Sequence, residues 1–255
     1  MTHLRIPAPV PLLGVLLLAA GPAPARAQTA REIVDRVDRM LRGNSSRADI
    51  VMEIATEHWT RSLAMRAWSL GTEYALVRVK APPREAGTAT LKVRDEVWNY
   101  LPRVDRTIKI PPSLMMGSWM GSHFTNDDLV KESRMIDDYD IAIAFEGPRD
   151  GVAVWEFTLT PRPEAAVVWG RIIEQVRKDD LMPTWARYYD DRGNLARTMT
   201  FSEFRRFDGR LVPTVMVVRP ADKPAERTTV RYRDLAFDVP LTPGFFSLRS
   251  LQAQR

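Results

Sequence analysis

The chain has 255 residues, contains no cysteine, and carries 37 Lys and Arg against 32 Asp and Glu, a formal net charge of +5 at pH 7. The lack of cysteine excludes disulfides, thiol catalysis and a lipidated N-terminal cysteine, so stability must come from a hydrophobic core. Basic residues alternate with acids along the chain, and we therefore expect no nucleic-acid partner.

The N-terminus has the pattern of a cleavable export signal. Arg5 forms a basic start, residues 10–20 are apolar, and Ala25, Arg26 and Ala27 make a small-x-small cleavage site. The apolar run is too short for a membrane span, although an uncleaved N-terminal anchor is the alternative. We expect segment 1–27 to be removed and residues 28–255 to form one domain in the periplasm.

The mature chain should begin with an amphipathic helix over residues 29–41. Ile33, Val37 and Leu41 recur on one face of this segment, Arg and Asp occupy the other, and Gly43 follows as a stop signal. The helix is therefore expected to pack on the rest of the protein by one face.

After the helix, apolar and polar residues alternate with a period of two, which predicts strands. The runs lie at 50–54, 63–70, 74–79, 88–94, 97–101, 141–145, 152–160, 168–177, 183–189, 195–207, 211–219 and 226–237. Short turns such as Gly71-Thr72 and Asp208-Gly209-Arg210 separate them, as in an antiparallel meander. Eleven or twelve strands with a few helices predict a mainly β fold, a large curved antiparallel sheet or barrel.

The only long insertion lies between Pro111 and Tyr139, and a helix could begin within it at a cap formed by Thr125 or Asn126. Its first part carries many large apolar side chains, which need an apolar surface to contact. They are Leu114, Met115, Met116, Trp119, Met120 and Phe124. Two interpretations remain open: a permanent plug in the core, or a lid over a ligand.

Catalytic and metal-binding patterns are sparse. Outside the export signal the only histidines are His58 and His123, and neither has a second ligand at a metal-like spacing. The segment GSWMG at 117–121 does not match a serine-hydrolase elbow, and no cofactor fingerprint is present. We therefore expect no metal, no cofactor and no catalytic residues.

One block of the sequence carries a family resemblance. Its features are the W-x-Y-x-P run at Trp98, Tyr100 and Pro102, the following Arg103 and Arg106, and a G-S-x-F-x-x-x-D-L element at Gly121, Ser122, Phe124, Asp128 and Leu129. With these features the sequence resembles the LolA-like family, the outer-membrane lipoprotein-sorting proteins. The resemblance implies an incomplete, strongly curved antiparallel barrel whose open side is covered by helices and whose interior is an apolar cavity.

The resemblance also implies a function. The chain would be a non-enzymatic, monomeric carrier that binds lipid or lipoprotein acyl chains noncovalently, with an inner-membrane transporter or an outer-membrane acceptor as partners. The residues expected to line the cavity or form a lid are Ile33, Val37, Leu41, Trp98, Tyr100, Leu114, Met115, Met116, Trp119, Met120 and Phe124.

Two other hypotheses remain. In the first, the chain is a periplasmic interaction module that docks on a membrane transporter through the same loop, and its interior is only a core. In the second, it is an enzyme acting on envelope lipids through His123 with Asp127 or Asp128, although the sequence offers no nucleophile.

Overall fold

The computed structural model describes residues 29–128, 135–165 and 167–253. The predicted export signal, its cleavage site and Leu129 of the resemblance motif lie outside the described residues. Among the helices in these ranges, none has the length and apolar character needed to cross a bilayer.

Thirteen strands of the described residues form one sheet in which neighbours run antiparallel, in the order β6-β5-β4-β3-β2-β1-β13-β12-β11-β10-β9-β8-β7. The first half comprises β1 (Ser45–Ala55), β2 (Thr60–Leu70), β3 (Tyr74–Ala81), β4 (Ala89–Val93), β5 (Glu96–Leu101) and β6 (Arg106–Lys109). The second half comprises β7 (Tyr139–Arg149), β8 (Val152–Pro161), β9 (Arg171–Arg177), β10 (Pro183–Tyr189), β11 (Leu195–Phe207), β12 (Arg210–Pro220) and β13 (Arg227–Phe237).

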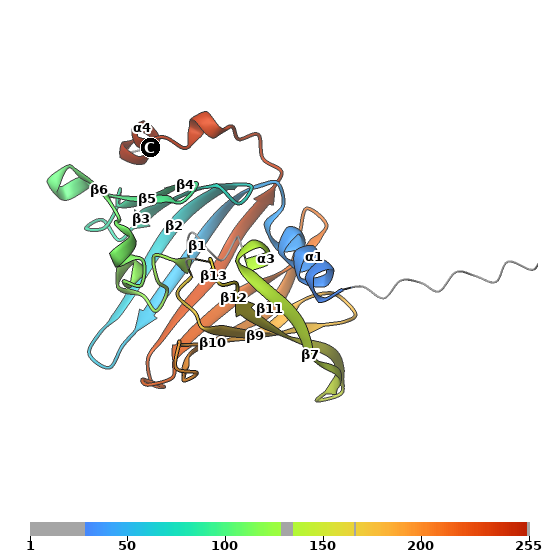
Figure 1. Ribbon diagram of the computed structural model, residues 1–255. Helices are drawn as coiled ribbons and strands as arrows, with labels where there is room; N and C mark the ends of the chain where they lie inside the picture. The colour runs from blue at the N-terminus through green and yellow to red at the C-terminus, as the bar shows by residue number, and fades with distance from the viewer. Residues whose placement is uncertain (1–28, 129–134, 166, 254–255) are drawn as a thin grey trace, which may run out of the picture.

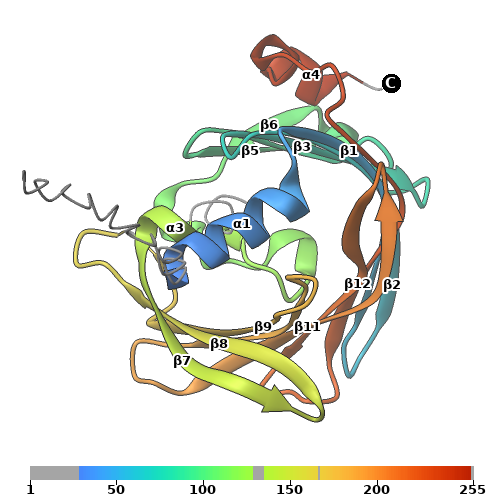
Figure 2. The ribbon, with the colours of Figure 1, turned by 90° about the vertical axis from the view of Figure 1, so that its right-hand side faces the viewer.

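The sheet curls strongly but does not close, since β6 and β7 remain at its two edges (Figures 1 and 2). This confirms the predicted mainly β fold and incomplete antiparallel barrel. The strand missing from the prediction is β6, which has four residues and lies between a left-handed turn at Asp105 and Pro111. Such a short run gives too little alternation to be recognised.

The helices are short: α1 (Ala30–Arg42), α3 (Met135–Asp138) and α4 (Leu248–Gln252). Figure 2 shows α1 lying across the inside of the curled sheet, and α4 outside it. Helix α1 begins with a capping box between Thr29 and Glu32 and ends at Gly43, whose φ of 67° suits glycine. The predicted helix is therefore present, one residue shifted at each end.

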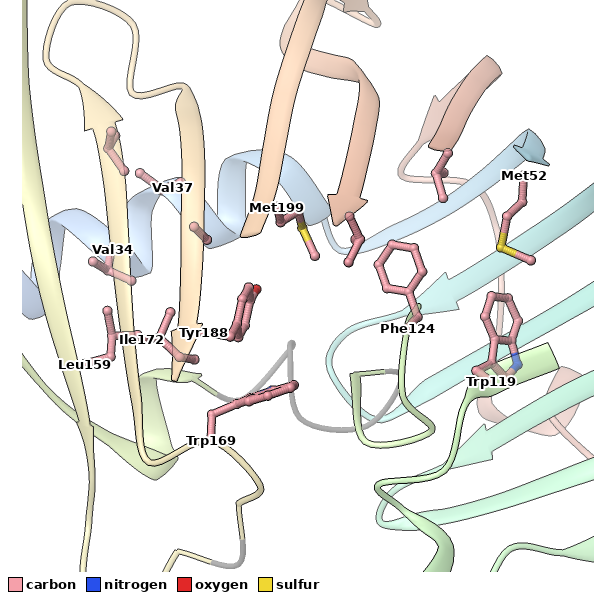
Figure 3. Close-up of a cluster of buried hydrophobic side chains, with 14 of the residues drawn as sticks. Val34, Val37, Met52, Trp119, Phe124, Leu159, Trp169, Ile172, Tyr188 and Met199 are labelled. Carbon is pink, nitrogen blue, oxygen red and sulfur yellow. The ribbon is translucent and has the colours of Figure 1, made fainter. Parts of the chain in front are cut away.

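Apolar clusters stabilise both faces of the sheet, and two of them are larger than the third. The inner cluster joins α1, the loop after β6 and both halves of the sheet (Figure 3). Its labelled members are Val34, Val37, Met52, Trp119, Phe124, Leu159, Trp169, Ile172, Tyr188 and Met199. In the second cluster, Phe246 and Leu251 of the C-terminal segment pack on Leu76, Leu91 and Tyr100 of β3 to β5.

Gly170 offers a test of how tightly the second half is packed. A Cβ at this position would lie 2.6 Å from the carbonyl oxygen of Asp190 and 2.9 Å from Cα of Asp191, both of which are backbone atoms. We expect Gly170→Ala to lower the free energy of unfolding by about 1–3 kcal/mol. Gly244→Ala, where the nearest side-chain atom lies 3.9 Å away, is the control. Equal stability of the two variants in urea denaturation would contradict this packing.

Candidate functional site

A partly open cavity of about 390 Å³ lies between α1 and the sheet. Its walls come mainly from α1, from β1 to β3 and from β11 to β13, with single residues from β4, β9, β10 and α3. The apolar lining residues are Val34, Val37, Leu41, Ala48, Ile50, Ala67, Trp68, Ala75, Val77, Met135, Phe201, Val212, Met216, Tyr232 and Leu235. A hollow of this size, walled mainly by apolar side chains, has the character of a small-molecule binding site.

Small side chains on adjacent strands explain why this space is open. Ser46 pairs with Ser69, which pairs with Ala75, and all three line the cavity. In the next cross-strand row, Ala48 pairs with Ala67. Protein interiors normally fill such space with side chains, so two neighbouring rows of Ala and Ser leave a hollow beneath α1.

One end of the cavity wall is polar. The hydroxyls of Ser46 and Ser69 lie 2.7 Å apart, and Nζ of Lys92 donates a hydrogen bond to the carbonyl oxygen of Thr72 at 2.5 Å. Lys92 lies opposite Ala75 on the neighbouring strand, so it extends the row of Ser46 and Ser69. The cavity wall therefore combines this polar row with many apolar side chains, which suits an amphipathic occupant.

An ion pair on α1 also faces the cavity. Asp38 accepts a hydrogen bond from Arg42 one helical turn later, and both residues line the wall. Burial raises the pKa of the Asp38 carboxyl to about 6, although the neighbouring Arg42 acts in the opposite direction. The charge of Asp38 therefore changes just below neutral pH.

Residues 119–128, in the loop after β6, are held in the interior by a buried ion pair. Arg197 on β11 donates to both carboxylate oxygens of Asp128, at 2.6 and 2.5 Å, and to the carbonyl oxygen of His123 at 3.2 Å. Its guanidinium also lies over the rings of Trp169 and Tyr188, 4.5 and 4.3 Å from their centroids. Charge-assisted bidentate bonds and cation–π contacts in a buried setting are strong, so this loop is firmly anchored.

The imidazole of His123 adds a second anchor. Its Nδ1 lies 2.8 Å from the Thr228 hydroxyl, and its Nε2 lies 3.0 Å from the Glu226 carboxylate. The hydrogen bond with His123 lowers the pKa of Glu226. Both ring nitrogens thus contact β13 or the turn before it, while Asp128 pairs with Arg197. The geometry gives His123 a structural role and does not couple its ring to Asp128.

The sequence-predicted site residues fall into three groups. Val37 and Leu41 line the cavity, and Ile33 packs in the adjoining core. Of the loop residues, Trp119 and Phe124 are buried in that core and Met120 packs against it, whereas Leu114 and Met116 are each 54% exposed and Met115 is half-buried.

Trp98 and Tyr100 form the third group. They belong to the cluster beneath the C-terminal segment, and the Tyr100 hydroxyl donates to Asp105 at 2.9 Å. The structure does not place them on the cavity wall.

Sequence reasoning missed the small residues of β1 and β2 that open the cavity. The available signal was the recurrence of Ser and Ala at alternate positions, Ser46 with Ala48 and Ala67 with Ser69. Within the part of the chain that the structure describes, no three His, Asp or Glu residues gather in a way that could hold a metal ion.

A protein-family model and several solved structures are similar to this chain. A protein-family model described as "Uncharacterized protein" matches residues 71–253. No curated protein matches the chain. A DUF1329 family protein from Desulfovibrio piger is 25% identical with a TM-score of 0.80, covering 88% of this chain and 98% of its own.

Two further solved structures agree. A domain with a proposed role in outer membrane lipoprotein sorting, from Vibrio parahaemolyticus, has a TM-score of 0.78 at 22% identity and covers 88% of this chain and 98% of its own. A LolA superfamily protein from Nitrosomonas europaea has a TM-score of 0.74 at 21% identity, covering 87% and 98%. The fold expected from the resemblance to the LolA-like family is confirmed.

The buried ion pair can be tested by removing one charge. In Asp128→Asn the amide oxygen can still accept from the Thr125 backbone, 2.7 Å away in the native chain, but the Arg197 cation loses its counter-charge. We expect the free energy of unfolding to fall by about 3–5 kcal/mol. Asp234→Asn, which breaks the exposed pair with Arg47, should cost less than about 1 kcal/mol. Comparable losses in denaturant titrations would show that burial does not strengthen this pair.

The ionisation of Asp38 should make the free energy of unfolding depend on pH. Its folded pKa of about 6 exceeds the ordinary 3.8, so between these values the folded state binds the extra proton. The stabilisation that comes from binding this proton is therefore complete below about pH 4 and is lost as the pH rises to about 6. The free energy of unfolding should fall by roughly 2–3 kcal/mol over that range. Denaturant titrations of wild type and Asp38→Asn from pH 4 to 7 measure this. A difference between the two that does not change with pH would contradict the assignment.

Proposed function

Because the chain belongs to the family whose model matches residues 71–253, and because it has the LolA-like fold, we propose that it is a periplasmic carrier of acyl chains. Its cargo would be a lipid or the lipid moiety of a lipoprotein, bound noncovalently in the cavity beneath α1. The cargo would pass between an inner-membrane transporter and an outer-membrane acceptor.

The observation that carries this proposal is the apolar cavity of about 390 Å³. Small-molecule sites in proteins measure roughly 300–1,000 Å³. The cavity falls within this range and is walled mainly by apolar side chains, which favours an acyl ligand and disfavours an interior that is only a core.

The energetics fit reversible carriage. Burying about twelve methylenes at roughly 0.8 kcal/mol each contributes on the order of 10 kcal/mol, before the cost of ordering the chain. The polar row of Ser46, Ser69 and Lys92 would receive the head of the ligand, since an apolar wall cannot satisfy its hydrogen bonds. No covalent chemistry is needed for such a role.

Release of a tightly held chain requires a movable wall, and we assign that role to α1. Val37 and Leu41 on α1 line the cavity, and at the helix start Arg31 contacts α3 through the carbonyl oxygen of Ile136 and an exposed ion pair with Asp137. The 119–124 part of the loop after β6 is less suited to move, because the buried Arg197 pair anchors it. In this proposal Trp119 and Phe124 are the plug and α1 is the lid.

Filling the cavity should abolish uptake. Ala67→Leu adds three carbons into the hollow, and at roughly 0.8 kcal/mol per displaced methylene we expect affinity for a fluorescent fatty acid to fall more than about tenfold. Ala153→Leu, at an exposed position of β8 away from the cavity, is the matched control and should bind as wild type. Thermal unfolding of both variants verifies that they are folded.

Native mass spectrometry of gently purified protein supplies the second readout. A stoichiometric lipid or acylated peptide on wild type, depleted in Ala67→Leu, is the expected result. Wild-type protein that is empty and does not take up the fatty acid, or an Ala67→Leu variant that binds it normally, would refute the proposal.

A further inference from the structure

Exposed apolar side chains concentrate at one edge of the sheet. Five of the ten large hydrophobic residues that are exposed within the described ranges fall between positions 101 and 116. They are Leu101, Val104, Ile108, Leu114 and Met116, with exposed fractions of 38, 61, 43, 54 and 54%. Scattered exposed apolar residues are ordinary, but such a concentration in sixteen residues marks an interaction surface.

These residues sit on a projecting hairpin and the turn that follows it. Val104 lies in the short helix η1 (Pro102–Val104) that joins β5 to the edge strand β6. Leu101 pairs with Arg106, which places Leu101 and Ile108 diagonally across the two strands on one face. Figure 1 shows this hairpin at one extreme of the molecule, with the segment after β6 descending beside it. We refer to residues 101–116 as the β6 edge surface.

The same hairpin carries an excess of positive charge, with Arg103, Arg106 and Lys109 against the single carboxylate of Asp105 between residues 101 and 109. The side chains of Arg103 and Arg106 are exposed and form no hydrogen bond or ion pair with any described residue. The neighbouring charges are engaged: Lys109 pairs with Glu96, and Asp105 accepts the Tyr100 hydroxyl. Val104, the most exposed large hydrophobic residue of the described chain, therefore lies beside two exposed arginines on a surface with excess positive charge.

We propose that the β6 edge surface docks on an anionic lipid bilayer, with Val104 and Leu101 entering the acyl boundary and Arg103 and Arg106 binding phosphate groups. Apolar wedges flanked by basic residues are what a negatively charged membrane surface attracts, and guanidinium groups bind phosphate through paired hydrogen bonds. A projecting tip fits a bilayer better than it fits a protein groove. Addition of a protein strand to β6 is disfavoured because β6 has only four residues.

This inference goes beyond carriage, because it assigns a surface and a partner that the cavity does not require. The docking surface belongs to β5, β6 and the turn after them, whereas the cavity lies beneath α1. A variant that blocks the cavity should therefore leave docking intact. Docking on a membrane would place the carrier where acyl chains are collected or delivered.

The absence of cysteine allows a site-specific test. The chain carrying Val104→Cys, labelled with an environment-sensitive fluorophore, is mixed with vesicles of phosphatidylcholine containing about 30% phosphatidylglycerol. We expect a blue shift that is absent with pure phosphatidylcholine and is lost at high salt, because surface electrostatics are screened. Val152→Cys, a comparably exposed position at 40% on β8, is the matched control and should not shift.

Co-sedimentation with the same vesicles supplies the second measurement. We expect Val104→Asp and the double variant Arg103→Gln, Arg106→Gln each to reduce bound protein at least fivefold, while Val152→Asp and Ala67→Leu bind as wild type. Wild-type protein that ignores anionic vesicles, or binding that Val104→Asp leaves unchanged, would overturn the proposal. Loss of vesicle binding in Ala67→Leu would instead show that membrane affinity depends on the cavity.

Discussion

The buried pair of Arg197 and Asp128 is the interaction on which the interior of this protein depends. The two residues are 69 positions apart, and their contact joins the end of the long loop to the second half of the sheet. Once Asp128 is fixed, His123 reaches Thr228, and Trp119 and Phe124 enter the core beside α1. Without these side chains, the interior of the curled sheet would be open to water. The ion pair thus supports the buried 119–124 segment, whereas Leu114 and Met116 of the same loop stay exposed.

A second constraint is the distribution of side-chain size across β1 and β2. Large residues such as Met52 and Leu63 fill one end of the inner face, whereas Ala48 and Ala67 leave the other end open. The cavity therefore does not arise from loose packing. The register of β1 and β2 places small side chains next to one another, and α1 covers the hollow that they leave.

Much of the fold could be predicted from the sequence, because its elements are local. Periodicity placed α1 and the hairpins, and only the four-residue β6 lacked enough alternation to be seen. The site was harder, since its determinants are long-range. Trp98 and Tyr100 share one face of β5, but the C-terminal segment covers that face, and no local pattern reveals this. The pairing of Asp128 with Arg197 could not be predicted either, because nothing in the sequence distinguishes Arg197 from the other arginines of the alternating strands.

The unpaired edges of the sheet have a mechanical consequence. In a closed barrel, strand number and stagger fix the radius, so the internal volume cannot change without breaking backbone hydrogen bonds. Here β6 and β7 remain separate edges, and every strand-to-strand hydrogen bond can persist while the curl tightens or relaxes. The width of the space inside the curled sheet is therefore not fixed by strand number and stagger. The curvature of the sheet can thus change with no change of secondary structure.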